Sequence, residues 1–541
     1  YRIADFAAAL PSDQYDVIVL RQGDIARTLN QLADFRVVWF WRARLTPAVA
    51  RLLKWSIDRG SVVVGDIDDL VFASSSVTVD DIDGFRAMGW NPSSAGPLFS
   101  ARSAVLAAAD LRTATTKPLV EALEMDIGPA VALPNGYDET SWNISTLARR
   151  LRPPSGLFRI GYAGGTRTHQ RDLQVAAPAI AQFLTDNQDA RLVLFEGCVN
   201  LLEFPELMAH VDQVEWRARV PISAMPFEYA RFDVSIAPLE PANRFCDAKS
   251  ALKFFEAALV DVVSVASPTP PFRELIQDGN NGFLAESQLD WYQAFAALFR
   301  DAERRHSLAN QARQDAIWNC GPLRQGRMVS DVIAAVLRGE TQPLDPAQSW
   351  PLRTFPAVST ATVNVVADYC RPVIAGGSVA LRVTSSTADV VSILESIANQ
   401  DRDDLDLIVV AEGADTEVVN QVSTWLLSNR RRFARVRLGT LMGSCSETVA
   451  ANCMFALAMS LYLVWLAPDA GPLDSHAISQ ALAEARRRKV GRVPLASGAS
   501  PPTQSVVYSV EAWAAVGGLD EAAPTFSDAL DSLGVGGLNV F

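Results

Sequence analysis

The amino-acid sequence predicts an α/β protein of several domains, and three observations lead to this class. The chain has 541 residues, which is more than a single hydrophobic core usually organises. Hydrophobic residues make up 49% and charged residues 20% of the chain, as in ordinary globular proteins. Short apolar runs alternate with amphipathic stretches along the sequence, a pattern typical of parallel sheets covered by helices.

The first predicted domain spans residues 1–150. Its apolar runs predict buried strands at 16–20, 37–40, 61–64, 111–115 and 130–133. Amphipathic stretches predict helices at 24–32 and 46–59. The sequence Pro134-Asn135-Gly136 then predicts a turn.

The second predicted domain, residues 151–338, opens after a break at 152–156 that contains two prolines and a glycine. Strands are expected at 158–162, 190–195, 214–218, 232–237 and 261–266. A charged helix at 290–313 is expected to close the domain.

A proline-rich linker, residues 339–375, separates this part from a third α/β domain at 376–541. Strands of the third domain are expected at 379–384, 406–410 and 461–466. Its apolar stretch 449–467 has the length of a membrane span, but Asn452 and Ser460 interrupt it and Pro468 follows it. We therefore interpret this stretch as a buried helix that leads into a buried strand, and we expect no transmembrane segment.

Charge and cysteine content narrow the class of protein. The net charge of −13 argues against a nucleic-acid binder, although it is compatible with a local basic pocket. No two of the six cysteines stand at CxxC spacing, and only four histidines accompany them, so a zinc site is not expected. Scattered cysteines indicate a reduced, cytoplasmic protein. Because the chain begins at Tyr1, we expect that its natural start is missing.

A glycine-rich connection follows the strand predicted at 158–162. It contains Gly164, Gly165, Thr166, Arg167 and His169, and a helix is expected from about Asp172. Glycines let a backbone approach a ligand closely, and a helix N-terminus favours anions, so this connection suits a diphosphate. The alternatives stay open: the glycines can serve only as a tight connection, and His169 can contact the bound ligand or only cap a turn.

A basic segment within residues 231–281 carries the strongest signal for a ligand. Its candidate ligand residues are Asp247, Lys249, Ser250, Lys253 and Glu256, with a helix expected from about residue 248. Two lysines offer cations to a diphosphate, and the glutamate offers an acceptor to ribose hydroxyls. A solvated helix face with charge pairs is the alternative, but the helix is otherwise apolar.

The runs KSALKFFEAALV (residues 249–260) and RELIQDGNNGFL (residues 273–284) resemble the donor domain of glycosyltransferase family 4. The resemblance extends from about residue 158 to 313. It implies a GT-B arrangement of two Rossmann-like domains, a retaining transferase and no metal. It also implies that Glu256 holds the ribose, while Lys249 and Lys253 neutralise the diphosphate leaving group.

Two further features bear on the substrates implied by this resemblance. The family often has a glutamate eight residues before the late one, whereas this chain has Ala248, so the identity of the sugar stays open. In the first domain, Asp68 follows a predicted strand, at the edge where open α/β sheets bind ligands. Asp68 is the candidate for orienting an acceptor hydroxyl; a turn or capping cluster is the alternative.

The third domain resembles a single-Rossmann (GT-A) transferase of family 2 at residues 390–400, 406–413 and 511–520. Ala411 and Glu412 stand where that family has aspartates, and only Asp469 remains of its second, metal-binding motif. A metal site normally needs several oxygen ligands. We therefore expect an inactive module, with a divalent metal at Asp469 only if the domain is active.

The resulting hypothesis is a retaining glycosyltransferase, cytoplasmic or at the inner face of the membrane. It would move a sugar from a nucleotide-diphosphate sugar to a glycan or lipid-linked acceptor in surface-polysaccharide biosynthesis. Two alternatives remain: a non-catalytic carbohydrate-binding scaffold, and a bifunctional enzyme with an active C-terminal domain.

Overall fold

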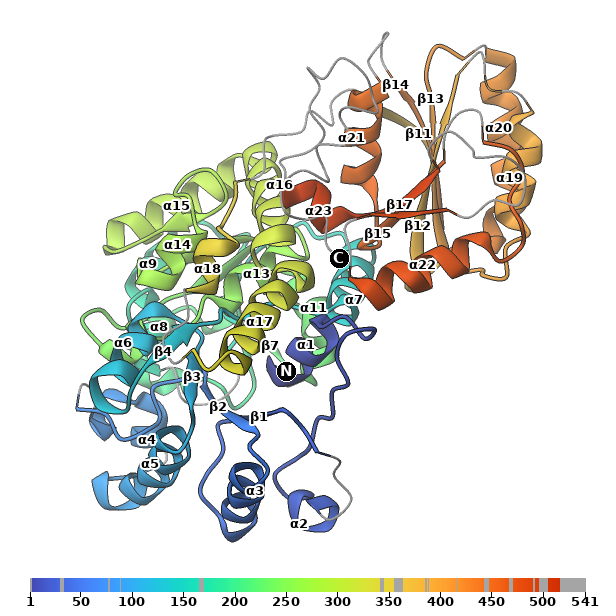
Figure 1. Ribbon diagram of the computed structural model, residues 1–541. Coiled ribbons are helices and arrows are strands. Elements are labelled where there is room, and N and C mark those ends of the chain that lie inside the picture. Colours follow the sequence, from blue (N-terminus) through green and yellow to red (C-terminus); the bar gives the residue numbers. More distant parts are fainter. Residues whose placement is uncertain are drawn as a thin grey trace. The chain divides into compact units, whose positions relative to one another are not determined.

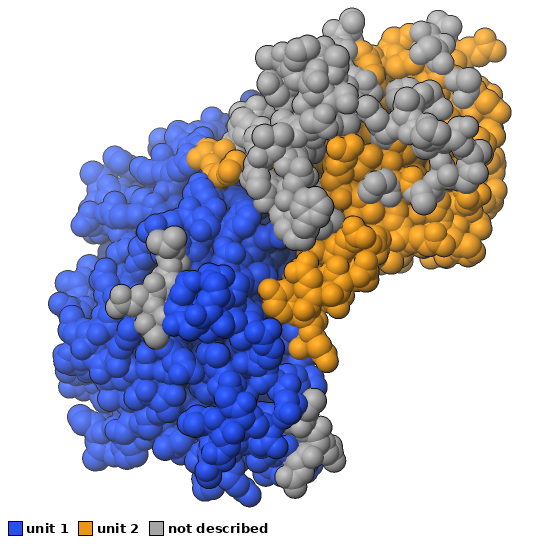
Figure 2. Space-filling view, in the orientation of Figure 1, with its two compact units in different colours: residues 1–10, 17–137, 152–352 blue, residues 11–16, 138–151, 353–541 orange. Residues whose placement is uncertain are grey.

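A computed structural model describes most of the chain and divides it into two compact units. The described residues are 2–29, 34–75, 78–87, 89–164, 170–340, 345–354, 363–384, 387, 389–414, 416–441, 447–466, 470–489, 492–495 and 505–515. Unit 1 comprises Tyr1–Leu10, Val17–Tyr137 and Arg152–Leu352. Unit 2 comprises Pro11–Asp16, Asp138–Leu151 and Arg353–Phe541 (Figure 2).

The first sheet of unit 1 has four parallel strands in the order β1-β2-β3-β4 (Figure 1). Its strands are β1 (Val37–Trp41), β2 (Val62–Ile67), β3 (Leu111–Ala114) and β4 (Ala130–Ala132). The accompanying helices are α1 (Arg2–Ala9), α2 (Ile25–Thr28), α3 (Pro47–Asp58), α4 (Asp83–Ala87), α5 (Pro92–Ala107) and α6 (Lys117–Asp126). Thr46 and Thr116 cap α3 and α6 by accepting N–H bonds, which fixes where both helices begin.

The second sheet of unit 1 has six parallel strands in the order β10-β9-β8-β5-β6-β7. Its strands are β5 (Phe158–Gly161), β6 (Ala190–Phe195), β7 (Val214–Arg217), β8 (Val234–Ala237), β9 (Val263–Ala266) and β10 (Phe283–Leu284). Gly161 is required in β5, because a Cβ atom there would lie 2.2 Å from the ring of Phe232. These two sheets confirm the predicted α/β fold with parallel strands.

Ten α-helices of unit 1 lie between β5 and residue 338 in the described residues, and a short eleventh one follows them in the predicted linker. They are α8 (Gln170–Gln174), α9 (Ala177–Asp186), α10 (Pro205–Met208), α11 (Met225–Tyr229), α12 (Arg244–Asp247), α13 (Leu252–Ala258), α14 (Pro270–Leu275), α15 (Gln288–Arg300), α16 (Ala302–Asn319) and α17 (Pro322–Leu337). The single helix expected at 290–313 is wrong. Asp301 ends α15 in an extended conformation and caps α16 through Arg304 N–H, so two helices form.

Residues 16–20 are not the buried strand that their apolar pattern predicts. They form no strand, and the exposed fractions of Val17, Ile18 and Val19 are 43%, 53% and 52%. An apolar run becomes a buried strand only where a neighbouring strand pairs with it, and in the described residues β1 pairs with β2 alone. The helix expected at 24–32 is shortened to α2, and residues 30–33 lie outside the described residues.

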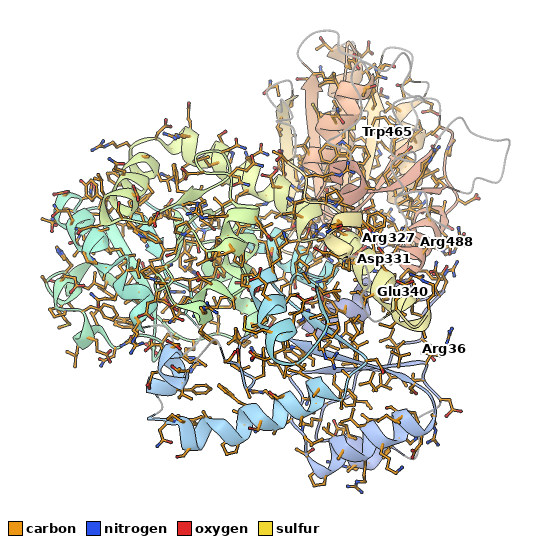
Figure 3. All side chains as sticks on the ribbon, turned by 60° about the vertical axis from the view of Figure 1, so that its left-hand side comes forward. Arg36, Arg327, Asp331, Glu340, Trp465 and Arg488 are labelled. Carbon is orange, nitrogen blue, oxygen red and sulfur yellow. The ribbon has the colours of Figure 1, made fainter. Side chains whose placement is uncertain are left out.

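The predicted linker, residues 339–375, is not uniformly extended: residues 345–350 pack on α17, and residues 363–370 form a strand of unit 2, β11 (Val363–Cys370). Within the linker, a short helix α18 (Pro346–Ser349) is followed by Trp350. The Trp350 indole N–H donates to the Asp331 carboxylate at 2.7 Å. The Arg327 guanidinium carbon lies 6.0 Å from the centre of the Trp350 ring. Both partners project from α17 (Figure 3). Figure 1 also shows α1 beside α17. These two helices are far apart in the sequence but pack directly against each other.

Unit 2 contains a seven-stranded mixed sheet in the order β11-β14-β13-β12-β15-β17-β16. Its strands are β11 (Val363–Cys370), β12 (Gly377–Val383), β13 (Leu405–Ala411), β14 (Arg435–Leu441), β15 (Tyr462–Leu466), β16 (Arg492–Pro494) and β17 (Val506–Ser509). The four central strands β14, β13, β12 and β15 are parallel, and the outer pairings are antiparallel. The antiparallel outer strands were not predicted.

The helices of unit 2 are α7 (Glu139–Arg150), α19 (Val390–Ala398), α20 (Thr416–Asn429), α21 (Glu447–Leu457), α22 (Ala477–Arg488) and α23 (Val510–Ala515). α7 is anchored there by Trp142, whose indole N–H donates to Met459 O at 2.9 Å. The stretch 449–467 forms α21 and the buried strand β15, as predicted. Across the described residues, we find no helix with the length and hydrophobicity of a membrane span.

Candidate functional site

Asp172 and Lys249 form the centre of the candidate site. Asp172 lies on α8, which follows β5, and it is almost fully buried. Its carboxylate accepts the Lys249 ammonium at 2.9 Å, the backbone N–H of Glu240 at 3.1 Å and the Cys246 thiol at 3.3 Å. The lysine and aspartate side chains are 14% and 3% exposed. A mostly desolvated ion pair therefore holds the lysine in one place.

Lys249 is not on the helix that the sequence predicts from about residue 248. α12 ends at Asp247 and α13 begins at Leu252, so Lys249 lies in the connection between them. Its ammonium lies 5.1 Å from the centre of the Phe245 ring. Burial alone would lower the pKa of Lys249, but Asp172 and Cys246 raise it above the ordinary value for lysine. Lys249 therefore remains a cation at neutral pH.

Lys253 and Glu256 occupy the first turns of α13. Burial and the neighbouring charge of Lys249 lower the pKa of Lys253, while Glu256 opposes this shift. Lys253 forms no ion pair with any described residue. Glu256 accepts a hydrogen bond from the Tyr229 hydroxyl at 2.9 Å. The second lysine thus offers a desolvated ammonium whose repulsion from Lys249 an anion would relieve.

Asp68 and Asp69, which follow β2, face Arg42 at the end of β1. The Arg42 guanidinium forms ion pairs with both carboxylates. Burial raises the pKa of Asp69, and the cations Arg42 and Lys249 oppose that shift. Asp69 therefore lies within electrostatic range of the lysines. Asp66, in contrast, is a buried structural residue, and its carboxylate forms an ion pair with Arg2 Nε at 2.7 Å.

The first sheet also fixes the loop that carries Lys249. The Thr116 hydroxyl donates to Ala248 O at 2.8 Å, and the Asn135 amide donates to the Ser250 hydroxyl at 2.9 Å. The hydrogen bond from Asn135 thus fixes the position of the Ser250 side chain. Burial raises the pKa of Asp247, which Arg244 opposes. The loop residues 247–250 are held from both sheets of unit 1.

The structure describes only the start of the glycine-rich connection. Gly164 is buried, and its N–H donates to Tyr162 O at 3.0 Å. Gly165, Thr166, Arg167 and His169 lie outside the described residues, and so does Asp469 of unit 2. Their proposed roles remain predictions.

A cavity of about 310 Å³ adjoins the loop but does not include the lysines. Its lining includes Thr116, Asn135, Ser250, Phe255 and Glu274. Of its own cations, Lys117 pairs with Glu274 at 2.9 Å and Arg324 is buried, whereas Lys249 and Lys253 lie outside its lining. Among the described residues, no three His, Cys, Asp or Glu side chains are grouped so as to hold a metal ion.

Asp172 is a site residue that the sequence did not predict. An aspartate near the start of a helix has the signature of a cap, and nothing local indicates a partner 77 positions away. The sequence did not predict Arg42 either. Arg42 contacts Asp68 and Asp69 only because β1 pairs with β2, and no local pattern indicates that pairing.

The comparison with protein families gives one match. Residues 158–301 match the family model "Glycosyl transferases group 1". The matched segment runs from β5 through α15, and so contains Asp172, Lys249, Lys253 and Glu256. It overlaps the segment whose motifs resemble a transferase donor domain. No curated protein matches the chain.

Several solved structures are similar to part of the chain. HepE of Anabaena, in complex with UDP-glucose, is 14% identical, with 57% of this chain and 82% of that chain covered and a TM-score of 0.41. The pneumococcal O-GlcNAc transferase GtfA, in complex with UDP and GlcNAc, is 12% identical, with 58% and 59% covered and a TM-score of 0.42. Sucrose-phosphate synthase of Thermosynechococcus elongatus is 11% identical, with 59% and 81% covered and a TM-score of 0.39.

Proposed function

We propose that unit 1 is a GT-B glycosyltransferase that transfers a sugar from a nucleotide-diphosphate sugar with retention of configuration and without a metal. The observation that carries this proposal is the pair of partly buried lysines, Lys249 and Lys253, within the segment that matches the transferase model. Asp172 forms an ion pair with Lys249, and Lys253 forms none with any described residue. The remaining positive charge suits a diphosphate.

The arrangement supports a simple division of work. When the bond between sugar and diphosphate breaks, negative charge grows on the leaving diphosphate. Lys249, which Asp172 holds in place, and the neighbouring Lys253 would stabilise that charge, and electrostatic stabilisation of this kind is the largest catalytic effect in many enzymes. Glu256, oriented by Tyr229, would accept hydrogen bonds from the ribose. The glycine-rich connection at 164–169 would approach the diphosphate through its backbone.

On the acceptor side we propose that Asp68 orients the hydroxyl that attacks the sugar. Asp68 lies at the carboxyl end of β2, where open α/β sheets bind ligands. Its ion pair with Arg42 keeps the carboxylate in a fixed direction. We further propose that the acceptor is a glycan or a lipid-linked sugar of surface-polysaccharide biosynthesis, and that the reaction takes place on the cytoplasmic side of the membrane.

A donor screen tests the proposal. We expect the protein to bind one of UDP, GDP or dTDP in calorimetry, and to hydrolyse the matching nucleotide sugar slowly with and without Mn²⁺. In Glu256→Gln, nucleotide affinity is expected to fall about tenfold or more, because a charged hydrogen bond to the ribose is weakened. The same substitution at the exposed Glu124 is the matched control. Failure of every nucleotide to bind would overturn the proposed function and favour a non-catalytic scaffold.

Nucleotide binding is expected to weaken as the pH rises, at pH values below those at which an ordinary lysine titrates. The pKa of Lys253 is lowered, so the Lys253 side chain is fully protonated at low pH and loses its positive charge as the pH rises through that pKa. The pKa of Lys249 is raised, so Lys249 keeps its charge over the same range. Lys253→Arg should therefore flatten the profile measured by calorimetry, whereas Lys249→Arg should not. A wild-type profile that is already flat would exclude the lowered pKa of Lys253 as a factor in binding.

We propose that unit 2 is a GT-A-like module without transferase activity of its own. Glu412, at the end of β13, is held by Arg382 at 2.7 Å instead of standing free for a ligand. Manganese-dependent donor hydrolysis that disappears in Asp469→Ala would contradict this proposal and indicate a bifunctional enzyme.

A further inference from the structure

A second group of charged residues in unit 1 surrounds the carboxyl ends of β1 and β2. Arg42 follows β1 with a φ of +46°, a left-handed conformation that is costly for any residue except glycine. Its N–H donates to Asp66 O at 2.9 Å. This turn directs the guanidinium onto Asp68 and Asp69, with which it forms ion pairs. One arginine thus already provides a partner for both carboxylates.

Arg102 adds a second guanidinium from α5. Its Nη1 donates to Val71 O at 3.0 Å, but its Nε is buried and has no hydrogen-bond partner among the described residues. Burial and the charges of Arg42 and Arg44 lower the pKa of Arg102 to about 10, and Asp68 and Asp69 oppose this shift. Buried polar groups normally have a hydrogen-bond partner, so the Nε donor of Arg102 is an exception that needs an explanation.

Arg44 supplies the third guanidinium. The backbone beside it is fixed to α5, because Leu45 N–H donates to Ala101 O at 2.9 Å. The Arg44 side chain is exposed and forms no ion pair with a described residue. We call Arg42, Arg44 and Arg102 the arginine cluster. The charges of Arg42, Arg44, Asp68 and Asp69 all act on Arg102, so three guanidinium groups stand near only two carboxylates, and Lys249 adds further positive potential near Asp69.

We propose that the arginine cluster is a subsite for an anionic group, a carboxylate or a phosphate, carried by the acceptor. This inference rests on the proposed function, since it places the acceptor beside the donor lysines. The guanidinium fork matches both anions in geometry. The position at the carboxyl ends of β1 and β2 is the edge where open α/β sheets bind ligands. If the arginines served only to neutralise Asp68 and Asp69, Arg42 would suffice.

Calorimetry with three matched sugars tests the proposal: glucose, glucuronate and glucose 6-phosphate. The full chain is expected to bind glucuronate or glucose 6-phosphate at least about tenfold more tightly than glucose, with an advantage that shrinks at high salt. The variant Arg44→Ala/Arg102→Gln is expected to lose that advantage. Glutamine at 102 retains a donor for Val71 O, and residue 44 is exposed, so the fold is expected to persist. Arg51→Ala, on the exposed face of α3, is the control.

Two results would overturn the inference: charged sugars that bind no better than glucose, or an advantage that survives in Arg44→Ala/Arg102→Gln. Which of the two charged sugars gains more distinguishes a carboxylate from a phosphate. Binding of UDP, GDP and dTDP is measured in the same variants and should change less than about twofold. If the wild type bound no nucleotide, the proposed function would be refuted. The comparison of charged sugars with glucose would still test the anion subsite.

Discussion

Replacement of Lys249 by alanine is expected to lower donor turnover by about 100- to 1000-fold. The variant removes the ammonium that Asp172 fixes at 2.9 Å, and with it a charge that would stabilise the leaving diphosphate. Because the interaction strengthens as the bond breaks, kcat should fall more than nucleotide affinity. Steady-state kinetics on the donor identified in the screen provide the measurement.

Two further variants separate chemistry from folding. Lys249→Ala leaves the buried Asp172 without its cation, so Lys249→Met/Asp172→Asn removes both charges and should be equally slow while remaining folded by circular dichroism. Lys54→Ala on α3, where the lysine is 75% exposed and paired only with Asp58, should keep full activity. Undiminished donor turnover in Lys249→Ala would contradict the assignment of unit 1 as the transferase.

The second large effect concerns the stability of unit 2. Asp406→Asn is expected to destabilise that unit by about 3–5 kcal/mol, or by about 10 °C in melting temperature. Asp406 is fully buried in β13, pairs with Arg437 at 2.8 Å and accepts hydrogen bonds from the Ser378 hydroxyl and the Met459 N–H. The substitution leaves the charge of Arg437 buried without its partner, which is more costly than losing the pair.

Differential scanning calorimetry measures this effect, because only the transition of unit 2 should move. The double variant Asp406→Leu/Arg437→Met removes both charges and should recover much of the loss. Asp404→Asn, whose carboxylate pairs with Arg402 and is 35% exposed, should shift the transition by less than about 1 kcal/mol. A shift in Asp406→Asn no larger than in Asp404→Asn would show that the buried pair contributes little.

Local patterns predicted most of the elements that build unit 1. The Val-rich runs at β2 and β9 are continuous because strands of a covered parallel sheet are buried on both faces, whereas the apolar run of β1 lies at the sheet edge and is only partly buried. The same logic failed at residues 16–20, where an equally apolar run lies exposed. Burial of a strand depends on a neighbour that pairs with it, and a local window contains no information about that neighbour.

The sequence by itself determined the class of fold and the segment that carries the candidate donor site. Its repeating patterns specify strands and helices, and Lys249, Lys253 and Glu256 lie together in one short stretch of the chain. Only the tertiary structure decided which charges meet. Asp172 reaches Lys249 because α8 and the loop after α12 converge, and Arg42 reaches Asp68 because β1 pairs with β2. Electrostatic interactions depend on distance and burial, which chain folding sets and sequence separation does not.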